Sequence, residues 1–513
     1  MITYYIGLTI GPIIEVLQRA RKTRELWMGS YVFSFLMRTM IQKLHSQGYQ
    51  FLSPFFNPES VPGPVGLFHD RFIAMSEKNP DSIEKELNAA IDVAIDTLTE
   101  IIIKTKSSKP EKTDSVRAYL KKYLQISYII TPLKKEDNIF IEINNFLDNA
   151  ELQRTFICNP CAHSSHFEIF KTDEKRSYAT DPLAFLQFYA NQSSLRKNAF
   201  KQKRFLSMPE ISGKEIKIKI DDEDDRGDPF PPKTELKYKY AALIQADGDN
   251  IGKLVKKTGT NPDDAKEFSK ALFAFAAKVS ELSEPFGAQV IYAGGDDVLA
   301  FAPIVYNKYT VFDYLDELNR HFKYELKRLD LEETRTVSLS FGVTAVYYKH
   351  PLYEALGKAQ TNLFEEAKRF KHNGVEPKNA IAFELIKHSG QSMKNIFLQK
   401  DNDVYTAFKK LLNSELNEIS AIPHNLHHNL MRSRRVITQL SRGSDFPQRL
   451  AALFENNFDE SIHQEHKVKT GLGLTRELMV AYFRFYREES SHDTIFDEFF
   501  SALGIIKHLR GDR

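Results

Sequence analysis

Residues 289–303 read QVIYAGGDDVLAFAP, and residues 240–252 read YAALIQADGDNIG. Both stretches contain a short apolar run that is typical of a buried strand, and both place aspartates beside glycine. In the first stretch, the apolar runs Val290–Tyr292 and Val298–Phe301 flank the turn Gly294–Asp297, which predicts a β-hairpin. These stretches decide the fold, because each places acidic residues where a predicted strand ends.

The segments around these stretches complete a recognisable order of elements. Asn261 and Pro262 are favourable first residues for a helix with one apolar face. A second helical stripe covers residues 311–326, and residues 337–346 alternate like a strand. The order strand, helix, two strands, helix, strand predicts a ferredoxin-like palm domain over residues 237–391. Nucleic-acid polymerase palms and nucleotide cyclases share this arrangement.

Three aspartates should meet in this topology, because the strands that carry them are neighbours. Converging carboxylates of Asp247, Asp296 and Asp297 offer the hard oxygen ligands that Mg²⁺ or Mn²⁺ prefers. Two such ions, about 3.5–4 Å apart, can activate an attacking hydroxyl and stabilise a pyrophosphate leaving group. A Gly-Gly-Asp-Asp turn alone is often an ordinary hairpin, but the joint pattern favours a catalytic two-metal site.

Glycines and polar residues beside the aspartates predict a nucleotide pocket. A glycine turn allows close approach of a phosphate or base, and the start of the helix after the first stretch can present backbone amides to a triphosphate. A lysine at a helix end could clamp the triphosphate, although cations there also favour the helix dipole. The predicted nucleotide-binding residues are Gly248, Asp249, Asn250, Gly252, Gly294, Gly295 and Lys368.

Length and composition bound the remaining possibilities. A chain of 513 residues is long enough for three or four domains. Its 70 Lys and Arg nearly balance its 68 Asp and Glu, so bulk charge neither favours nor excludes nucleic acid, and any basic surface must be local. The start lacks a basic leader, and no apolar run approaches the roughly 18 residues of a membrane span. We therefore expect a soluble, cytoplasmic protein without membrane contact.

A compact cluster of metal-ligating residues lies outside the palm. Cys158, Cys161, His163 and His166 offer two thiolates and two imidazoles, which zinc accepts. The spacing is tighter than in usual zinc fingers, so a distant ligand could replace one histidine. A reduced cysteine pair without metal remains an equal alternative.

The rest of the chain divides by its apolar periodicity. Residues 1–148 mix strand and helix patterns, with strands predicted at Tyr123–Thr131 and Ile139–Ile143, and are interpreted as a non-catalytic palm-like domain with a helical insertion. Residues 149–236 hold the Cys/His cluster and an acidic linker, and residues 392–513 show helical spacing. The predicted fold class is α+β multidomain: two ferredoxin-like palm domains of which one is catalytic, a helical insert suited to zinc, and a C-terminal helical domain.

Two separated signatures resemble one known family. The N-terminal signature is Ile10–Pro12 with the run Ala20–Tyr31, and the palm signature is Ala246–Gly252 with Gly294–Asp297. Together they resemble the large, polymerase-like subunit of type III CRISPR complexes, specifically the Cmr or III-B branch. The resemblance follows the predicted domain order along nearly the full chain.

This resemblance implies a partner set and a reaction. Guide RNA and other Cmr subunits would hold the protein, and target RNA would activate its palm for antiviral defence. In most relatives the palm joins ATP into cyclic oligoadenylates with release of pyrophosphate, whereas in some Cmr relatives it joins ATP to S-adenosylmethionine. The residues do not distinguish these acceptors. The resemblance gives the metal roles to Asp247, Asp296 and Asp297.

Other interpretations stay open at this point. The palm could be a scaffold that only binds nucleotide or RNA, or the chain could be a diguanylate-cyclase-like enzyme, since Ser340–Val343 also resembles that family. Many relatives carry an HD nuclease domain before the first palm-like domain, which here begins at residue 3, so DNA cleavage by this subunit is not expected. The dipeptides His69-Asp70 and His492-Asp493 lack companion ligands and are interpreted as chance.

Overall fold

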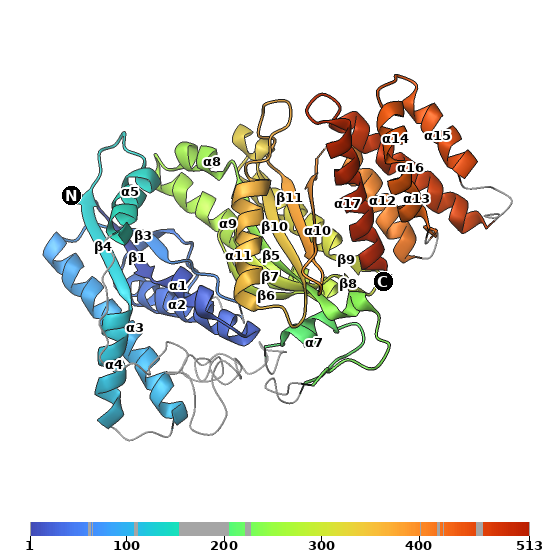
Figure 1. Cartoon of the computed structure of the whole chain (residues 1–513). Coiled ribbons are helices and arrows are strands. Elements are labelled where there is room, and N and C mark those ends of the chain that lie inside the picture. Colours follow the sequence, from blue (N-terminus) through green and yellow to red (C-terminus); the bar gives the residue numbers. More distant parts are fainter. Residues whose placement is uncertain are drawn as a thin grey trace.

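Three parts follow one another along the chain and side by side in Figure 1: a first domain with a four-stranded sheet, a palm with a six-stranded sheet, and a helical C-terminal part. None of the helices described in this computed structural model could cross a membrane by its length and apolar character. The structure describes residues 2–59, 63, 65–106, 111–152, 205–220, 227–400, 402–417, 421–423, 425–457 and 465–511.

The first domain is a ferredoxin-like unit. Its strands pair in the order β2-β3-β1-β4, and all of these pairings are antiparallel. The chain order strand, helices, two strands, helices, strand therefore confirms the predicted palm-like architecture. Its elements are β1 (Tyr4–Gly11), α1 (Ile13–Arg19), α2 (Thr23–His45), β2 (Gln50–Ser53), β3 (Arg71–Ser76), α3 (Pro80–Lys106), α4 (Glu111–Tyr123), β4 (Gln125–Pro132) and α5 (Ile139–Leu152).

The palm repeats this architecture and adds two strands. Its first four strands pair in the same spatial order, β10-β5-β7-β6, and β11 and β12 extend the sheet beyond β10. A short helix, α7 (Met208–Ser212), precedes it. The palm elements are β5 (Tyr240–Asp249), α8 (Ile251–Thr258), α9 (Pro262–Ser283), β6 (Gln289–Gly294), β7 (Asp297–Pro303), β8 (Val305–Tyr306), β9 (Tyr309–Thr310), α10 (Val311–Lys327), β10 (Ser338–Tyr347), α11 (Leu352–Thr361), a π-helical turn (Asn362–Ala367), β11 (Ala380–Ile386) and β12 (Ser392–Leu398).

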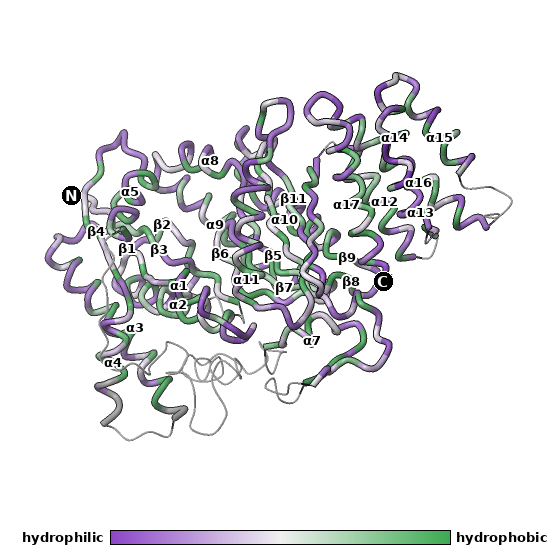
Figure 2. Tube along the Cα trace, in the orientation of Figure 1, coloured by the Kyte–Doolittle hydropathy of each residue, from purple (hydrophilic) through white to green (hydrophobic). Residues whose placement is uncertain are grey.

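Strand alternation explains why the palm sheet is covered on both faces. Ala242 and Ile244 belong to the core that includes α9 and α10, whereas Ala241 and Leu243 belong to the core that includes α2 and α11. Side chains of successive strand residues point to opposite faces, so a continuously apolar β5 must be buried on both sides. In Figure 2 the palm strands are largely apolar and the turns around them hydrophilic.

The C-terminal part confirms the predicted helical character, but the palm sheet reaches further than the predicted boundary at residue 391. β12 pairs antiparallel with β11 along its whole length. The helical spacing begins only after this strand. The helices are α12 (Asp403–Leu416), α13 (Leu426–Arg432), α14 (Arg434–Leu440), α15 (Phe446–Asn457), α16 (His466–Phe485) and α17 (His492–Arg510).

One predicted strand is a helix. Ile139–Ile143 forms the first turns of α5, in which Ile139, Phe140, Ile143 and Leu147 are buried. A short apolar run is compatible with both the strand period and the helix period. Here a helix forms, because α5 packs on β1 and also contacts the palm. The ring of Phe140 meets that of Phe268 at 6.0 Å, so α5 joins the two domains.

Helix α11 lies unusually close to strand β10 of the palm sheet. A Cβ on Gly342 in β10 would stand 2.1 Å from the backbone oxygen of Ala359 and 2.3 Å from the backbone nitrogen of Leu363. At this contact the α-helix gives way to the π-helical turn that precedes Lys368. Glycine is therefore required for the approach that places this turn against β10.

We predict that Gly342→Ala destabilises the protein by about 1–3 kcal/mol, because the new methyl group would collide with backbone atoms that cannot move independently. Chemical denaturation followed by circular dichroism measures this change. Gly357→Ala is the matched control: its Cβ would meet nothing within 4 Å, and alanine favours a helix by up to about 1 kcal/mol. Equal effects of the two substitutions would contradict the packing argument.

Candidate active site

The three predicted catalytic aspartates lie together at one end of the palm sheet. Asp247 is near the end of β5, and Asp296 and Asp297 form the turn between β6 and β7. The register pairs Ala246 with Val298, which places Asp247 beside Asp297. The two carboxyl groups share a hydrogen bond. The structure therefore brings together the residues that the sequence assigned to catalysis.

Gly248 allows the third carboxyl group to approach. A Cβ at this position would lie 2.6 Å from Oδ2 of Asp296. Instead, the backbone of Gly248 donates a hydrogen bond to the Asp296 carboxylate. Any side chain here would push the β6–β7 turn away from β5, so Gly248 contributes to the site through its lack of one.

Crowding changes the acidity of the cluster. Loss of solvent, followed by repulsion from Asp247, raises the pKa of Asp296 to about 6. Loss of solvent and repulsion from Asp296 and Asp247 also raise the pKa of Asp297 well above its usual value. Acidic groups that oppose one another's ionisation are typical of sites that receive cations.

The cluster is not a closed cage of ligands. In the described segments of the chain, no three His, Cys, Asp or Glu side chains are already spaced so that they could hold a metal ion by themselves. The Asp297 residue keeps exposed surface although its carboxyl group is packed against those of Asp247 and Asp296, and Asp247 is half-buried, so the cluster lies at an edge of the palm that solvent can reach. The donor set consists of hard oxygen atoms only, which fits Mg²⁺ or Mn²⁺, and a bound substrate could complete the coordination.

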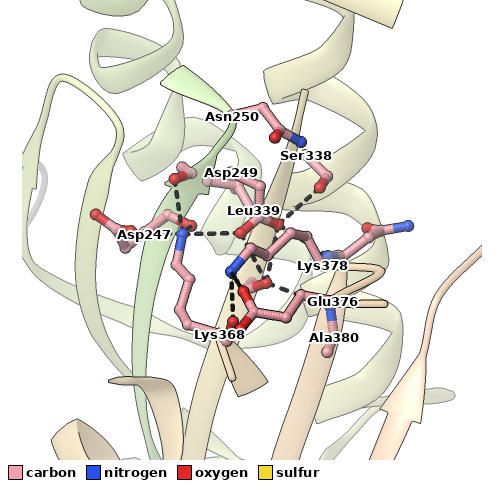
Figure 3. A network of polar contacts seen from close by, with 12 residues as sticks. Asp247, Asp249, Asn250, Ser338, Leu339, Lys368, Glu376, Lys378 and Ala380 are labelled. Atoms are coloured by element: carbon pink, nitrogen blue, oxygen red, sulfur yellow. Dashed lines mark hydrogen bonds and ion pairs between the residues drawn. The ribbon is translucent and has the colours of Figure 1, made fainter. Parts of the chain in front are cut away.

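Asp249 does not face the open site, although it is predicted as a nucleotide-binding residue. Its side chain is buried, with 1% of the residue exposed. Ser338 and Ser340 donate to it at 2.7 and 2.8 Å, and the backbone N–H of Asn379 donates at 2.9 Å. Figure 3 shows this cluster of contacts. Because successive strand residues point to opposite faces, Asp249 shares a side of β5 with Asp247 but lies deeper, and it is committed to protein donors.

Lys368 ties the two aspartates of β5 together. Its Nζ donates to Oδ1 of Asp249 at 2.8 Å, and it lies 2.5 Å from Oδ2 of Asp247. It also donates to the backbone oxygens of Asp247 and Gly248 at 3.0 and 2.7 Å. Burial lowers the pKa of Lys368, but the Asp249 and Asp247 carboxylates outweigh it and raise the pKa overall. Lys368, which the sequence predicts to bind a triphosphate, is thus engaged by atoms of β5 in this structure.

The other predicted nucleotide-binding residues border the open side. Asn250 has a left-handed backbone, with φ of 61°, and donates to the backbone oxygen of Thr336 at 2.8 Å. Gly252 lies exposed in the first turn of α8. Gly294 and Gly295 precede the acidic pair, and Gly295 has a φ of 65° that favours glycine.

The first domain contributes residues that sequence reasoning missed. The carboxylate of Asp70 lies close enough to raise the pKa values of Asp297 and Tyr292, in both cases behind the loss of solvent. A backbone contact explains the approach: the N–H of Ala293 donates to the oxygen of Gly66 at 3.1 Å. The His69-Asp70 dipeptide thus stands beside the site, although the sequence offers no spacing signal for it. Cys158, Cys161, His163 and His166 lie outside the described residues, so the zinc prediction stays a prediction.

Two family models match the two sheet-containing domains. The model "CRISPR-associated protein Cmr2, N-terminal" matches residues 5–100, and the model "Cas10/Cmr2, second palm domain" matches residues 240–382. A curated relative, the CRISPR system Cmr subunit Cmr2 of Pyrococcus furiosus, is 30% identical over 176 residues. That match spans 30% of this chain and only 19% of the relative.

Solved structures show the same fold over most of the chain. The apo state of a type III-B Cmr-beta complex contains a chain with a TM-score of 0.54 and 12% identity, covering 85% of this chain and 75% of that one. The same type of complex bound to cognate target RNA gives a TM-score of 0.56 and 13% identity, covering 85% and 76%. At these identities the likeness concerns the fold.

The raised pKa of Asp296 predicts a pH-dependent cost to folding. A carboxyl group whose pKa is higher in the folded chain opposes folding when it ionises, so the cost is absent near pH 4 and complete above about pH 6. In buffer with a chelator, Asp296→Asn should therefore be more stable than wild type at pH 8, by on the order of 1 kcal/mol, and equally stable at pH 4. Denaturant titrations at both pH values measure this difference.

The exposed Asp263, in the first turn of α9, provides the control. Asp263→Asn should give no gain at pH 8, because an acidic residue there favours the helix dipole. A gain for Asp296→Asn that is the same at pH 4 and pH 8 would contradict the proposed repulsion among the carboxylates.

Proposed function

This chain is a Cas10/Cmr2-type protein, and on that premise we propose that its palm transfers adenylate from ATP to build a cyclic oligoadenylate messenger. The observation that carries the proposal is the convergence of Asp247, Asp296 and Asp297 at the end of β5 and in the β6–β7 turn. The comparisons support the domain type, and the family resemblance supports the identity of the product.

The reaction would be a phosphoryl transfer. The 3′ hydroxyl oxygen of one adenylate attacks the α-phosphorus of ATP, a new P–O bond forms, and the bond to the β-phosphate oxygen breaks. Pyrophosphate leaves with that electron pair, and the hydroxyl proton passes to solvent or a neighbouring base. Positioning and charge stabilisation supply most of the catalysis in such reactions.

The charge of the site explains why divalent cations would be required. The carboxyl groups of Asp247, Asp249, Asp296 and Asp297 outnumber the described ammonium groups near them: Lys368 pairs with Asp247 and Asp249, and Lys323 lies near Asp249. A triphosphate would be repelled by this excess of carboxylates. Two Mg²⁺ or Mn²⁺ ions held by Asp247, Asp296 and Asp297 would neutralise the excess, activate the attacking hydroxyl and stabilise the leaving pyrophosphate.

The protein groups around the carboxylates would position the substrate. At Gly295 a Cβ would meet nothing within 4 Å, so this part of the rim is open and a phosphate can approach the backbone there, whereas the space at Gly248 is filled by the Asp296 carboxylate. Lys368 holds the end of β5 by its two aspartates and two backbone oxygens. We assign it a positioning role that fixes the orientation of the Asp247 carboxylate.

The partners belong to the same proposal. Guide RNA, target RNA and other Cmr subunits would hold the chain, since the similar type III-B Cmr-beta complex has been solved bound to cognate target RNA. The acceptor of the adenylate is decided by product analysis, because S-adenosylmethionine in place of a second ATP would use the same carboxylates. A scaffold without turnover would yield neither product.

We predict that Asp296→Ala/Asp297→Ala abolishes the nucleotide product of the reconstituted, target-bound complex, because both substitutions remove charge from the metal site. Mass spectrometry of reactions containing ATP, S-adenosylmethionine and Mg²⁺ or Mn²⁺ measures the product and names it. Asp263→Asn/Asp264→Asn removes two neighbouring acidic charges from the exposed start of α9 and should leave the product unchanged. Absence of product from the wild-type complex, with target binding demonstrated, would favour the scaffold.

We predict that Lys368→Ala lowers kcat at least about tenfold, because Asp247 loses its tether and Asp249 loses its buried counter-charge. It should also lower the free energy of unfolding. A role in positioning Asp247 predicts a higher Mn²⁺ concentration for half-maximal activity, which a purely structural role would not change. The exposed Lys371→Ala is the control. An unchanged Mn²⁺ requirement would contradict the assignment.

A further inference from the structure

A cavity lies at the junction of the palm and the C-terminal helices. It has a volume of about 740 Å³ and is lined by the turn after β11, the first residue of β5 and side chains from α13 and α17. Tyr240 begins β5 and Asp249 ends it. With a rise of about 3.3 Å per residue, roughly 20 Å or more separate this cavity from the catalytic carboxylates. The cavity is therefore separate from the aspartate cluster of the palm.

Positive charge dominates the lining. Lys387, Lys394 and Lys507 line the cavity and are half-buried. Lys394 pairs with Glu366 at 2.6 Å, but in the described parts of the chain no acidic side chain forms an ion pair with Lys387 or Lys507. An acidic residue in the lining, Asp497, is paired with the guanidinium of Arg434 at 2.8 Å. The remaining charge of the cavity is thus cationic.

Two histidines, His427 (half-buried) and His508 (buried), lie next to these lysine charges. Burial, followed by the lysine charges, lowers the pKa of His427 to about 4, with Lys507 and Lys387 as the neighbours, and that of His508 to about 4, with Lys387. His508 is 5% exposed. Its Nε2 and the Nδ1 of His427 are buried and have no hydrogen-bond partner within the described residues. Unpaired buried nitrogen atoms are costly, so the rings of both histidines lie in a part of the wall that is sensitive to what the lysines bind.

Aromatic rings form part of the same wall. The imidazole of His427 lies 3.7 Å from the ring of Phe500, and that of His508 meets the ring of Tyr240 edge-on at 4.4 Å. The cavity therefore combines lysine ammonium groups, ring nitrogens and flat apolar surface. Its volume lies in the range of about 300–1,000 Å³ that is usual for small-molecule sites.

We propose that this cavity binds a phosphate-bearing small molecule of nucleotide size, with its phosphate held between Lys387 and Lys507. Lysine ammonium groups bind phosphate as point charges, and a concave surface of one sign concentrates the opposite ion. The ligand would contact the palm hairpin between β11 and β12 and the helix α17 at once. Its binding would therefore stabilise the docking of the C-terminal helices on the palm.

The test uses the full chain carrying Asp296→Ala/Asp297→Ala, in buffer with EDTA, so that metal-dependent binding at the palm does not contribute. ADP is the probe, and isothermal titration calorimetry measures its Kd. Lys387→Ala/Lys507→Ala should raise this Kd at least about tenfold. Lys270→Ala/Lys278→Ala, which removes the same charge from exposed positions on α9, should leave it unchanged.

Histidine NMR of the same chain with both lysines intact gives a readout that does not depend on the variants folding. Addition of ADP should shift the ring signals of His427 and His508, but not those of the distant His45. An unchanged Kd in Lys387→Ala/Lys507→Ala, or histidine signals that do not move, would overturn the proposal. Equal binding of citrate would overturn the phosphate assignment, and displacement of ADP by RNA oligonucleotides of higher affinity would reassign the cavity to RNA.

Discussion

The burial of one carboxylate, that of Asp249, is the constraint on which the site depends. A charge removed from water must be matched by donors, and here they come from three separate elements of the palm. Satisfying Asp249 therefore fixes β5, β10, the start of β11 and the helix end that carries Lys368. Asp247 lies two residues earlier on the same strand, so its position is fixed as well, and it pairs with the same lysine, Lys368. The donors to Asp249 are Ser338, Ser340, the backbone N–H of Asn379 and Lys368.

The same polar cluster continues toward the C-terminal helices. The side chain of Asn319 in α10 donates to Asn379 at 2.6 Å and to Gln399 at 2.7 Å. Gln399 donates to Asp316 at 2.9 Å, and Asp316 receives Lys409 from α12 at 3.0 Å. A continuous set of hydrogen bonds thus joins the C-terminal helices to the residues that hold β5. The packing of the C-terminal helices on the palm and the arrangement of the site residues therefore depend on the same hydrogen bonds.

The sequence predicted the elements that local patterns define, but it did not reveal the residues whose roles depend on contacts far apart along the chain. Strand periodicity and the glycine–aspartate turns located the palm and brought Asp247 to Asp296 and Asp297. The role of Asp249 was not visible, because its partners lie about 90 to 130 residues away in β10 and before β11. The serines at alternate positions 338 and 340 were the available signal. Asp70 could not be found, since only the packing of the first domain against β6 brings it near the site.

The central claim is that Asp247, Asp296 and Asp297 together hold two divalent ions with a nucleotide. Electron paramagnetic resonance of the full chain with Mn²⁺ and a non-hydrolysable ATP analogue tests it most directly. The account predicts a spin-coupled pair of Mn²⁺ ions in the wild-type chain that disappears in Asp296→Ala/Asp297→Ala. A signal of isolated Mn²⁺ that is the same in both proteins would contradict it.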